Sequence, residues 1–415
     1  MANWIEWDDD ALRWTIKLGF IKIKVRDKAK FKQRRLDFQK SLENTPIVKN
    51  KIVFSNYFGK SYGCNPKYIA DEIIRQNLPY ELVWLVRAPE EHINEFPKQI
   101  KLVRYLSPES YTELASAKVW VDNTRKKPYW EQGLIKKKEQ IYIQTWHGPL
   151  GMKKIEASIK NESPMWRKFA KIDSKNIDFL LASNETDKKI LSECFWFDGP
   201  ILKTGYPRND IFFANDAEKK KIKNKVYSKL NIKENDKLLL YLPTFRDNGR
   251  TNAFNLDIEN VLKAAEDNQN QSYVAAIKLH PNTRKAVREL FDFNNKKIID
   301  AIEYPDVQEL LIAADMIITD YSSAIFDAML EYTKCFIFAT DLKEYTKERG
   351  FYFPLSDTPF SIAENNEQLI NNIKNFDNNE YKNKVKQYLK DKEYILDANS
   401  SNRVVEKIKQ SIGEN

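Results

Sequence analysis

From about residue 50 onward the chain alternates between two kinds of segment. Short apolar runs such as KIVFSN and YELVWLV fit buried strands, and the amphipathic stretch near residues 65–77 fits a helix. Further strands are expected in the runs KVWVDN, QIYIQTW, DFLLAS and PILKTG. A strand-then-helix rhythm predicts parallel sheets covered by helices on both faces.

A second series of strands begins near residue 237, with the runs KLLLYLPT, SYVAAIKLHP, KKIID, DMIITD and KCFIFA. A turn-rich segment, GYPRNDIFF, separates the two series. We therefore expect two α/β domains that face each other across a cleft. Their predicted extents are residues 46–206 and 207–385, followed by a helical segment over residues 386–415.

Residues 1–45 have a different character. Trp, Ile and Phe residues stand among lysines, and the first proline is Pro46. This composition indicates a basic, amphipathic and mostly helical arm. Between residues 11 and 40 there are eleven Lys or Arg and two Asp, so this segment accounts for the whole net charge of +9.

A segment of this charge is expected to meet an acidic partner. We expect residues 1–45 to tether the chain to an anionic membrane surface and to lie outside the catalytic core. Two alternatives are that the aromatic face packs on the core, or that the arm binds a polyanionic product directly. Nucleic acid is not an expected partner, because no recognised nucleic-acid module accompanies the arm.

Several classes of protein lose their usual support. No run of about 18–20 apolar residues occurs, and the amino terminus does not have the order of a secretory signal, so a cytoplasmic protein peripheral to the inner face of the membrane is expected. Three scattered cysteines, Cys64, Cys194 and Cys335, are expected to be reduced core residues. There is no GxGxxG, P-loop or HExxH motif. No cofactor is indicated. No carboxylate pair is placed clearly enough to demand a divalent metal, although Asp247 and Asp320 leave that alternative open.

Two of the three histidines follow predicted strands directly. His147 stands in QTWHG and His280 in KLHP, whereas His92 falls in the acidic stretch PEEHINEF and is expected at the surface. Ligands of open α/β sheets bind beyond the carboxyl ends of strands, and histidine suits proton transfer near neutral pH. Either histidine alone could equally cap a helix or hold a loop. Their equivalent places in the two domains favour a functional role.

Two other strand ends have groups suited to phosphate. LPTFRD places Thr244, Arg246 and Asp247 after one strand, and arginine binds phosphate oxygens through its planar fork. ITDYSSAIFDAML places Ser322 and Ser323 at the start of a helix, where free backbone N–H groups favour an anion. The alternatives are a salt-bridged loop for the first motif and an ordinary helix cap for the second.

Together these motifs resemble a known family. QTWHG, GYPRND, LPTFRD, KLHP, ITDYSS and DLKEY followed by RGFYF occur in the order seen in CDP-glycerol glycerophosphotransferases of the TagB/TagF type, over roughly residues 50–385. The resemblance implies a GT-B architecture of two Rossmann-like domains, with the donor bound mainly by the second. The family often has a Thr-Pro pair after WHG, whereas Pro149, Leu150 and Gly151 follow here, which leaves the shape of the acceptor loop open.

The resemblance also implies roles for single residues. His147 matches the general base on the acceptor hydroxyl. The positions that match donor phosphate contacts are Thr244, Arg246, His280, Ser322 and Ser323. Further candidates in the same motifs are Asp247, Asp320, Asp327 and Arg208.

The function implied is transfer of an alditol phosphate, glycerol phosphate first, from a CDP-glycerol or CDP-ribitol donor to a lipid-linked or polymeric polyol-phosphate acceptor of teichoic acid or capsule synthesis, with CMP released. Domain closure would bring His147 to the donor and exclude water. One alternative is a GT-B glycosyltransferase that uses a nucleotide sugar. A second is a membrane- or polymer-binding scaffold without activity. The sequence does not separate glycerol from ribitol, or a primase from a polymerase.

Overall fold

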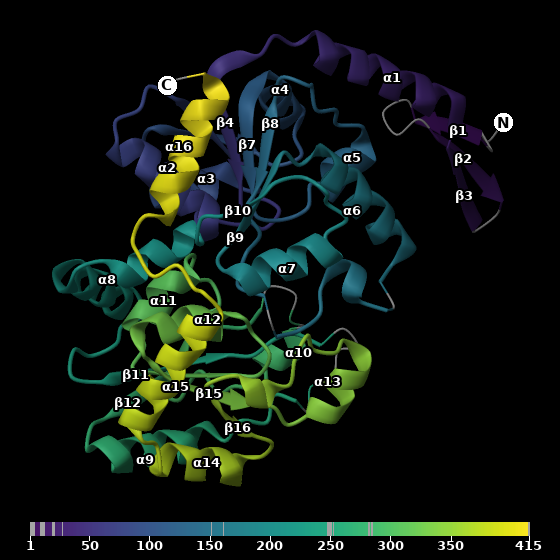
Figure 1. Ribbon diagram of the computed structural model, residues 1–415. Coiled ribbons are helices and arrows are strands. Elements are labelled where there is room, and N and C mark those ends of the chain that lie inside the picture. The colour runs from purple at the N-terminus through teal and green to yellow at the C-terminus, as the bar shows by residue number, and fades with distance from the viewer. Residues whose placement is uncertain are drawn as a thin grey trace.

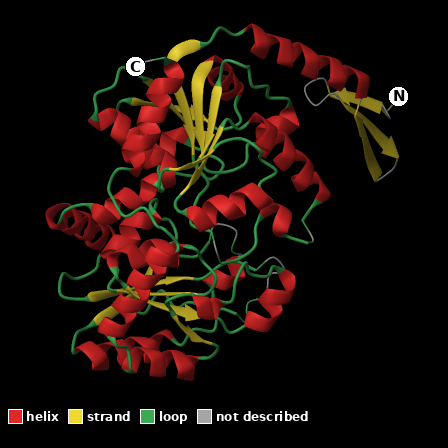
Figure 2. Cartoon of the chain, in the orientation of Figure 1, coloured by secondary structure: helices red, strands yellow, loops and turns green. Residues whose placement is uncertain are grey.

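The computed structural model describes residues 5–8, 13–18, 21–26, 28–150, 152–160, 162–246, 251, 253–280, 283 and 285–413. Two α/β domains lie one above the other, each built on a parallel sheet between helices (Figure 1, Figure 2). This is the GT-B-like arrangement expected from the sequence, and the expectation is confirmed. We call the two units the first and the second domain.

The first domain contains a seven-stranded sheet in the order β10-β9-β8-β7-β4-β5-β6. All of its pairings are parallel. Its strands are β4 (Val48–Ser55), β5 (Glu81–Val86), β6 (Ile100–Arg104), β7 (Ala117–Asp122), β8 (Ile141–Gln144), β9 (Phe179–Ala182) and β10 (Ile201–Lys203). The chain reverses its direction of travel across the sheet between β4 and β7. In such sheets this switch point is where ligands bind.

The second domain contains a six-stranded parallel sheet in the order β13-β12-β11-β14-β15-β16. This is the Rossmann order, with the switch point between β11 and β14. Its strands are β11 (Lys237–Leu242), β12 (Tyr273–Ile277), β13 (Ile298–Asp300), β14 (Met316–Thr319), β15 (Lys334–Phe338) and β16 (Ser361–Ala363). The sequence pattern predicted every strand of both sheets except β6 and β16.

Helices cover both faces of each sheet. Those of the first domain are α2 (Cys64–Arg75), α3 (Pro89–His92), α4 (Pro108–Ser116), α5 (Lys127–Gln132), α6 (Pro164–Asn176) and α7 (Glu185–Cys194), with 3-10 turns η1 (Ile93–Glu95) and η2 (Glu156–Ser158). Those that follow are η3 (Pro207–Phe213), α8 (Asp216–Lys229), α9 (Ile258–Gln269), α10 (Lys285–Arg288), α11 (Val307–Ala313), α12 (Ala324–Ala328), η4 (Met329–Glu331), α13 (Leu342–Glu348), η5 (Leu355–Asp357), α14 (Asn366–Lys374), α15 (Asn378–Asp391) and α16 (Ser400–Ile412).

Polar side chains start many of these helices by accepting a free backbone N–H at the first turn, which a helix cannot satisfy within itself. The capping residues include Ser107, Ser163, Asn184, Asn215, Asp257, Asp306, Asn365 and Asp377. Local sequence therefore decides where the helices begin.

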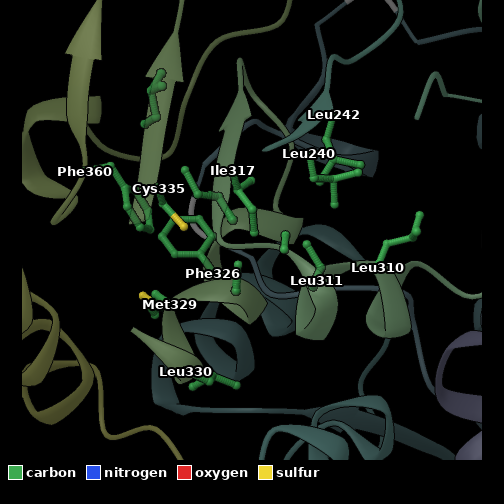
Figure 3. Close-up of a cluster of buried hydrophobic side chains, with 14 of the residues drawn as sticks. Leu240, Leu242, Leu310, Leu311, Ile317, Phe326, Met329, Leu330, Cys335 and Phe360 are labelled. Carbon is green, nitrogen blue, oxygen red and sulfur yellow. The ribbon is translucent and has the colours of Figure 1, made fainter. Parts of the chain in front are cut away.

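The cores explain why the strands are continuously apolar. Along β11, Leu238, Leu240 and Leu242 point into one buried cluster, and Leu239 and Tyr241 into another on the opposite face of the sheet. The first cluster packs β11, β14 and β15 against α11, α12 and η4 (Figure 3). Because both faces are covered, no polar alternation is visible in the sequence. The three cysteines are free and buried, as expected.

The amino-terminal arm differs from its prediction. Three strands, β1 (Ile5–Asp8), β2 (Arg13–Leu18) and β3 (Ile21–Arg26), form an antiparallel sheet that lies away from the body of the first domain (Figure 1). The prediction of a mostly helical segment is wrong there. Residues 21–26 alternate strictly between apolar and basic, and this two-residue period belongs to a strand.

Helix α1 (Lys28–Asn44) follows the small sheet, and its second half packs on the first domain. Leu42 is 3% exposed within the core of that domain, and the ring of Phe38 meets Tyr111 edge-on at 5.2 Å. Gln39 donates a hydrogen bond to the carbonyl of Gly133 at 3.2 Å. The end of the arm is therefore fixed to the domain by apolar contacts.

The carboxyl-terminal helix α16 returns to the first domain. Its residues Val404, Val405 and Ile408 are buried with Ile69 and Ile73 of α2. The backbone N–H groups of Ser400 and Ser401 donate to the carboxylate of Asp210, in the segment that joins the domains. In the described part of the chain, none of the helices has the length and apolar character needed to cross a membrane.

Candidate active site

The carboxyl edges of the two sheets meet at the domain interface. His147 follows β8, and Ser322 and Ser323 follow β14. A Cβ atom added at Gly148 would lie only 2.8 Å from the Oγ atom of Ser323 and 3.0 Å from Nη2 of Arg208. The WHG loop of the first domain and the DYSS loop of the second are therefore in close contact, and a larger residue at position 148 would force the side chain of Ser323 to move. The structure brings these two predicted motifs together.

His147 is oriented by a backbone carbonyl. Its Nδ1 atom lies 2.8 Å from the carbonyl oxygen of Asn123, the residue after β7. A carbonyl only accepts, so Nδ1 carries the hydrogen and the neutral ring keeps Nε2 as a proton acceptor. The pKa of His147 is lowered to about 4, mainly by burial. The charges of Arg208 and Lys153 contribute to this shift, and the hydrogen bond to Asn123 opposes it. The ring is therefore a neutral base at pH 7.

The loop that contains His147 is held from three sides. Trp146 adopts a left-handed backbone conformation, with φ of 53°. Its N–H donates to the Oε1 atom of Gln144 at 2.9 Å, and its carbonyl accepts from the side chain of Asn65 at 3.0 Å. The Oδ1 atom of Asp187 accepts the N–H of Leu150 at 2.7 Å. Burial raises the pKa of Asp187 to about 6. A non-glycine residue in this conformation costs energy, which the surrounding bonds offset.

The loop after β4 brings a lysine to the interface. Tyr57, Phe58 and Gly59 are consecutive residues with positive φ, and the Tyr57 N–H donates to Oδ1 of Asn123 at 2.9 Å. This tight turn places Lys60 near the second domain, where burial lowers the pKa of the Lys60 ammonium. Asn123 thus holds both the lysine loop and His147.

His280 lies among basic groups of both domains. The pKa of His280 is lowered to about 3, mainly by burial. The positive charges of Lys153, Lys60 and Arg349 contribute to this shift, as does its proximity to His147. The two predicted histidines therefore face the same site from opposite domains. The ring of His280 also packs on Phe245, with centroids 4.6 Å apart.

Lys278 adds another positive charge two residues before His280. Its ammonium donates to the carbonyl oxygens of Ile302 and Tyr304. Burial lowers the pKa of Lys278 to about 8, and repulsion from Lys60 adds to this effect. A cluster of basic groups whose pKa values are lowered by burial and by nearby positive charge forms a site that gains from binding an anion.

Arg246 lies in a buried ion-pair network. Its Nε and Nη2 atoms donate to the two oxygens of Asp341 at 2.7 and 2.9 Å, and Nη1 lies 2.9 Å from Asp320. Nη1 also donates to the hydroxyl of Thr244 at 2.9 Å. Asp320 accepts the Thr244 N–H at 2.9 Å, so the network ties the end of β11 to that of β14. Asp247 lies outside the described residues.

Ser322 and Ser323 are partly exposed at the start of α12, and the Oγ atom of Ser322 accepts the N–H of Ala324 at 3.4 Å. Asp327, further along the same short helix, is fully buried and pairs with Arg208. His92 lies apart from the site, 3.2 Å from Glu95. Among the residues that the structure describes, no group of three or more His, Cys, Asp or Glu side chains could hold a metal ion.

Sequence reasoning missed several residues of this site: Lys60, Asn123, Lys153, Lys278, Asp341 and Arg349. Lys60, Asn123 and Lys278 follow strands β4, β7 and β12, so the rule that ligands bind at carboxyl ends could have found them. Lys153 and Arg349 do not directly follow strands, and a contact between the two domains brings them together. Residue 153 forms an antiparallel bridge with Phe351, and the N–H of residue 154 donates to the carbonyl of Gly350 at 3.0 Å. Only the closed domain interface creates that pairing.

Two Rossmann-like sheets whose carboxyl edges face a shared basic site define a GT-B-like protein. The chain belongs to the CDP-Glycerol:Poly(glycerophosphate) glycerophosphotransferase family, whose sequence profile matches residues 38–410. The family expected from the motifs is thereby confirmed.

Named relatives support the same assignment. The chain is 31% identical over 341 residues to the teichoic acid poly(glycerol phosphate) polymerase of Staphylococcus epidermidis, covering 79% of this chain and 45% of that protein. It is 32% identical over 352 residues to the teichoic acid glycerol-phosphate transferase of Staphylococcus aureus, covering 80% of this chain and 86% of that protein. It thus spans about half the length of the polymerase.

The fold of the chain is also similar to that of a solved structure. A solved structure of the wall teichoic acid polymerase TagF superposes with a TM-score of 0.78 at 28% identity, covering 93% of this chain and 96% of that chain. The likeness therefore includes both domains.

Proposed function

We propose that this chain transfers an alditol phosphate, most directly glycerol phosphate, from a CDP-alditol donor to a hydroxyl of a polyol-phosphate acceptor. The observation that carries the proposal is a neutral histidine, His147, with Nε2 available, beside a basic site at the domain interface to which both domains contribute. Membership of the family and relatives named for glycerol phosphate transfer support the same substrate class.

The proposed reaction is a single displacement at phosphorus. The acceptor hydroxyl oxygen attacks the phosphorus that bears the glycerol, and Nε2 of His147 takes the hydroxyl proton. The bond from that phosphorus to the bridging oxygen breaks, and CMP leaves with the electron pair. Phosphoryl transfer of this kind depends on positioning and on neutralising the charge that collects on the phosphate oxygens. General-base help contributes roughly 10²–10⁴-fold.

The second domain supplies most of the proposed donor site, and Lys60 comes from the first domain. Thr244, His280, Ser322 and Ser323 lie at the ends of β11, β12 and β14, around the switch point of the Rossmann sheet. Lys278 and Lys60 supply positive charge for the pyrophosphate. A neutral His280 acts as a hydrogen-bond donor. Arg246 already donates to Asp341, Asp320 and Thr244. We therefore propose that Arg246 holds the ends of β11 and β14 in place instead of binding phosphate itself.

Product analysis tests the proposal. The full chain is incubated with CDP-glycerol or CDP-ribitol and a lipid-linked polyol-phosphate acceptor, and the nucleotide and polymer products are measured by mass spectrometry. The proposal predicts CMP together with an acceptor heavier by one alditol phosphate. Release of CDP or UDP from a nucleotide sugar would show a glycosyltransferase instead. An absence of turnover with every CDP-alditol would favour a binding scaffold.

We also propose that the amino-terminal arm holds the chain at an anionic membrane, where a lipid-linked acceptor would be found. The support is the run of basic residues in β2, β3 and the first turns of α1. Each basic residue near such a surface contributes about 1 kcal/mol. The second half of α1 packs on the first domain, so the proposal concerns the part of the arm before Phe38.

A further inference from the structure

Arg208, at the start of the segment that joins the two domains, contacts three separate parts of the chain. Its N–H donates to Oδ1 of Asn65 in α2 at 3.1 Å. Its Nη1 atom donates to the carbonyl oxygen of His147 and lies 3.5 Å from the sulfur of Cys64. Its Nη2 atom donates to Oδ2 of Asp327 in α12. One guanidinium thus bridges the WHG loop of the first domain and the serine-bearing helix of the second.

Asp327 is the carboxylate that neutralises this arginine. It is fully buried, and its Oδ2 atom also lies 3.3 Å from the side-chain nitrogen of Gln308 in α11. A buried arginine is stable only when it is paired, so each member of the pair requires the other. Asp327 reaches Arg208 from the helix that Ser322 and Ser323 open.

The Arg208–Asp327 pair is too buried to contact a substrate. Arg208 is 5% exposed, and two of its guanidinium nitrogens already donate to the His147 carbonyl and to Asp327. Its Nε atom is buried without a hydrogen-bond partner. Arg208 therefore acts through the groups it contacts. Gly148 lies directly against it, since a Cβ atom there would be 3.0 Å from Nη2.

We propose that Arg208 and Asp327 form an interdomain clasp. The clasp positions His147, the proposed general base, against α12 of the second domain. The clasp sets where His147 stands relative to Ser323, and neither of its members touches substrate. This inference rests on the proposed function for the identity of the reacting groups. Its structural half, the fixing of the His147 loop, holds independently of the reaction.

The test uses the full chain with Arg208→Gln and Asp327→Asn combined, which removes both charges together and leaves no unpaired ion. The matched control is Arg403→Gln with Asp397→Asn, an Arg–Asp pair on the surface next to the same linker. Three quantities are measured for each: the affinity for CDP-glycerol by calorimetry, kcat and KM for transfer, and hydrogen–deuterium exchange of the amides of residues 146–152.

The clasp predicts that the double variant binds CDP-glycerol within about 3-fold of the wild type. Its kcat should fall about 10–100-fold, because a displacement of about 1 Å at a reacting group has an effect of that size. Exchange over residues 146–152 should be at least about 10-fold faster, since the loop loses its anchor. The control pair should match the wild type in all three measurements.

Wild-type kcat and wild-type exchange in the double variant would overturn the clasp. A loss of CDP-glycerol affinity greater than about 10-fold would also overturn it, because the pair would then belong to the donor site. If the wild type itself transfers nothing, the proposed function fails, and the exchange measurement still decides the clasp. Should the double variant not fold, Arg208→Lys gives the same test, since one ammonium cannot reproduce both fork contacts.

Discussion

The Nδ1 atom of His147 lies 2.8 Å from the carbonyl oxygen of Asn123, and the side-chain oxygen of Asn123 accepts the N–H of Tyr57 at 2.9 Å. A single residue after β7 thus fixes both the tautomer of the histidine and the loop that leads to Lys60. Both contacts come from the switch point of the first sheet, between β4 and β7.

The first prediction concerns the histidine itself. His147→Ala should lower kcat about 10²–10⁴-fold, because the acceptor hydroxyl loses its general base. The affinity for CDP-glycerol should stay within a few-fold, since most of the proposed donor groups lie on the second domain. Steady-state kinetics and calorimetry measure the two effects. His92→Ala, on a histidine far from the site, is the control, and wild-type turnover in a folded His147→Ala protein would remove the proposed role.

The second prediction concerns pH. The pKa values of His147 and His280 are lowered to about 4 and about 3 in the folded chain. The unfolded chain takes up these protons near pH 6.5. The effect of these two histidines on folding stability is therefore absent above about pH 6.5, and it lowers stability progressively as the pH drops from there toward about 3. The lowered value of His147 also predicts that kcat/KM loses little between pH 7 and 5.5.

Urea unfolding at pH 7 and pH 5 measures the effect on stability. A pH profile of kcat/KM measures the effect on catalysis. The variant His147→Gln/His280→Gln should lose part of the pH dependence of stability. Comparing it with the wild type isolates the histidines from Asp187, whose pKa is raised to about 6 and whose effect has the opposite sign. An unchanged slope in the variant would contradict the assigned pKa shifts.

The third prediction concerns donor binding. His280→Ala and Ser322→Ala should each weaken the affinity for CDP-glycerol about 3–10-fold, since each removes a hydrogen-bonding group from the proposed pyrophosphate site. Lys278→Gln should have a larger effect, about 10-fold or more, because it removes a partly buried positive charge. Calorimetry gives all three values, with Lys384→Gln, an exposed lysine of α15, as the control. If all three variants bind like the wild type, the donor site lies elsewhere.

The fourth prediction separates Arg246 from that group. Arg246→Ala leaves Asp320 and Asp341 without their partner at a site where the arginine side chain is 2% exposed. Its main effect should be a loss of about 3–5 kcal/mol in the free energy of unfolding. Arg288→Ala breaks a surface pair with Asp300 in the same domain and should cost less than about 1 kcal/mol. An Arg246→Ala protein of normal stability that fails only to bind CDP-glycerol would return Arg246 to direct phosphate contact.

The fifth prediction concerns the arm. Replacing Lys22, Lys24, Lys28, Lys30 and Lys32 with Gln should abolish salt-sensitive co-sedimentation with anionic vesicles and leave transfer to a short soluble acceptor unchanged. Deleting residues 1–45 should instead destabilise the first domain, because it removes Phe38 and Leu42 from contact with the core. Undiminished vesicle binding by the five-lysine variant would exclude an electrostatic tether.

The sequence by itself determined most of the fold and the motif residues of the site. Continuous apolar runs predicted the strands of both sheets except β6 and β16, because a strand covered on both faces requires apolar side chains at every position. The motifs predicted His147 and His280 at strand ends in different domains, since parallel strands place their carboxyl ends on one edge.

Only the tertiary structure decided which of these groups act together. Lys60, Lys278 and Arg349 are far apart in the chain, and their charges meet because the two sheets face each other. The sequence motif predicted Arg246 as a phosphate ligand. In the fold its side chain pairs with Asp341, 95 residues away. In the same way Arg208 meets Asp327, 119 residues away, to link the two halves of the site. Local patterns fix periodicity and helix starts, whereas the partner of a buried charge depends on contacts distant in sequence.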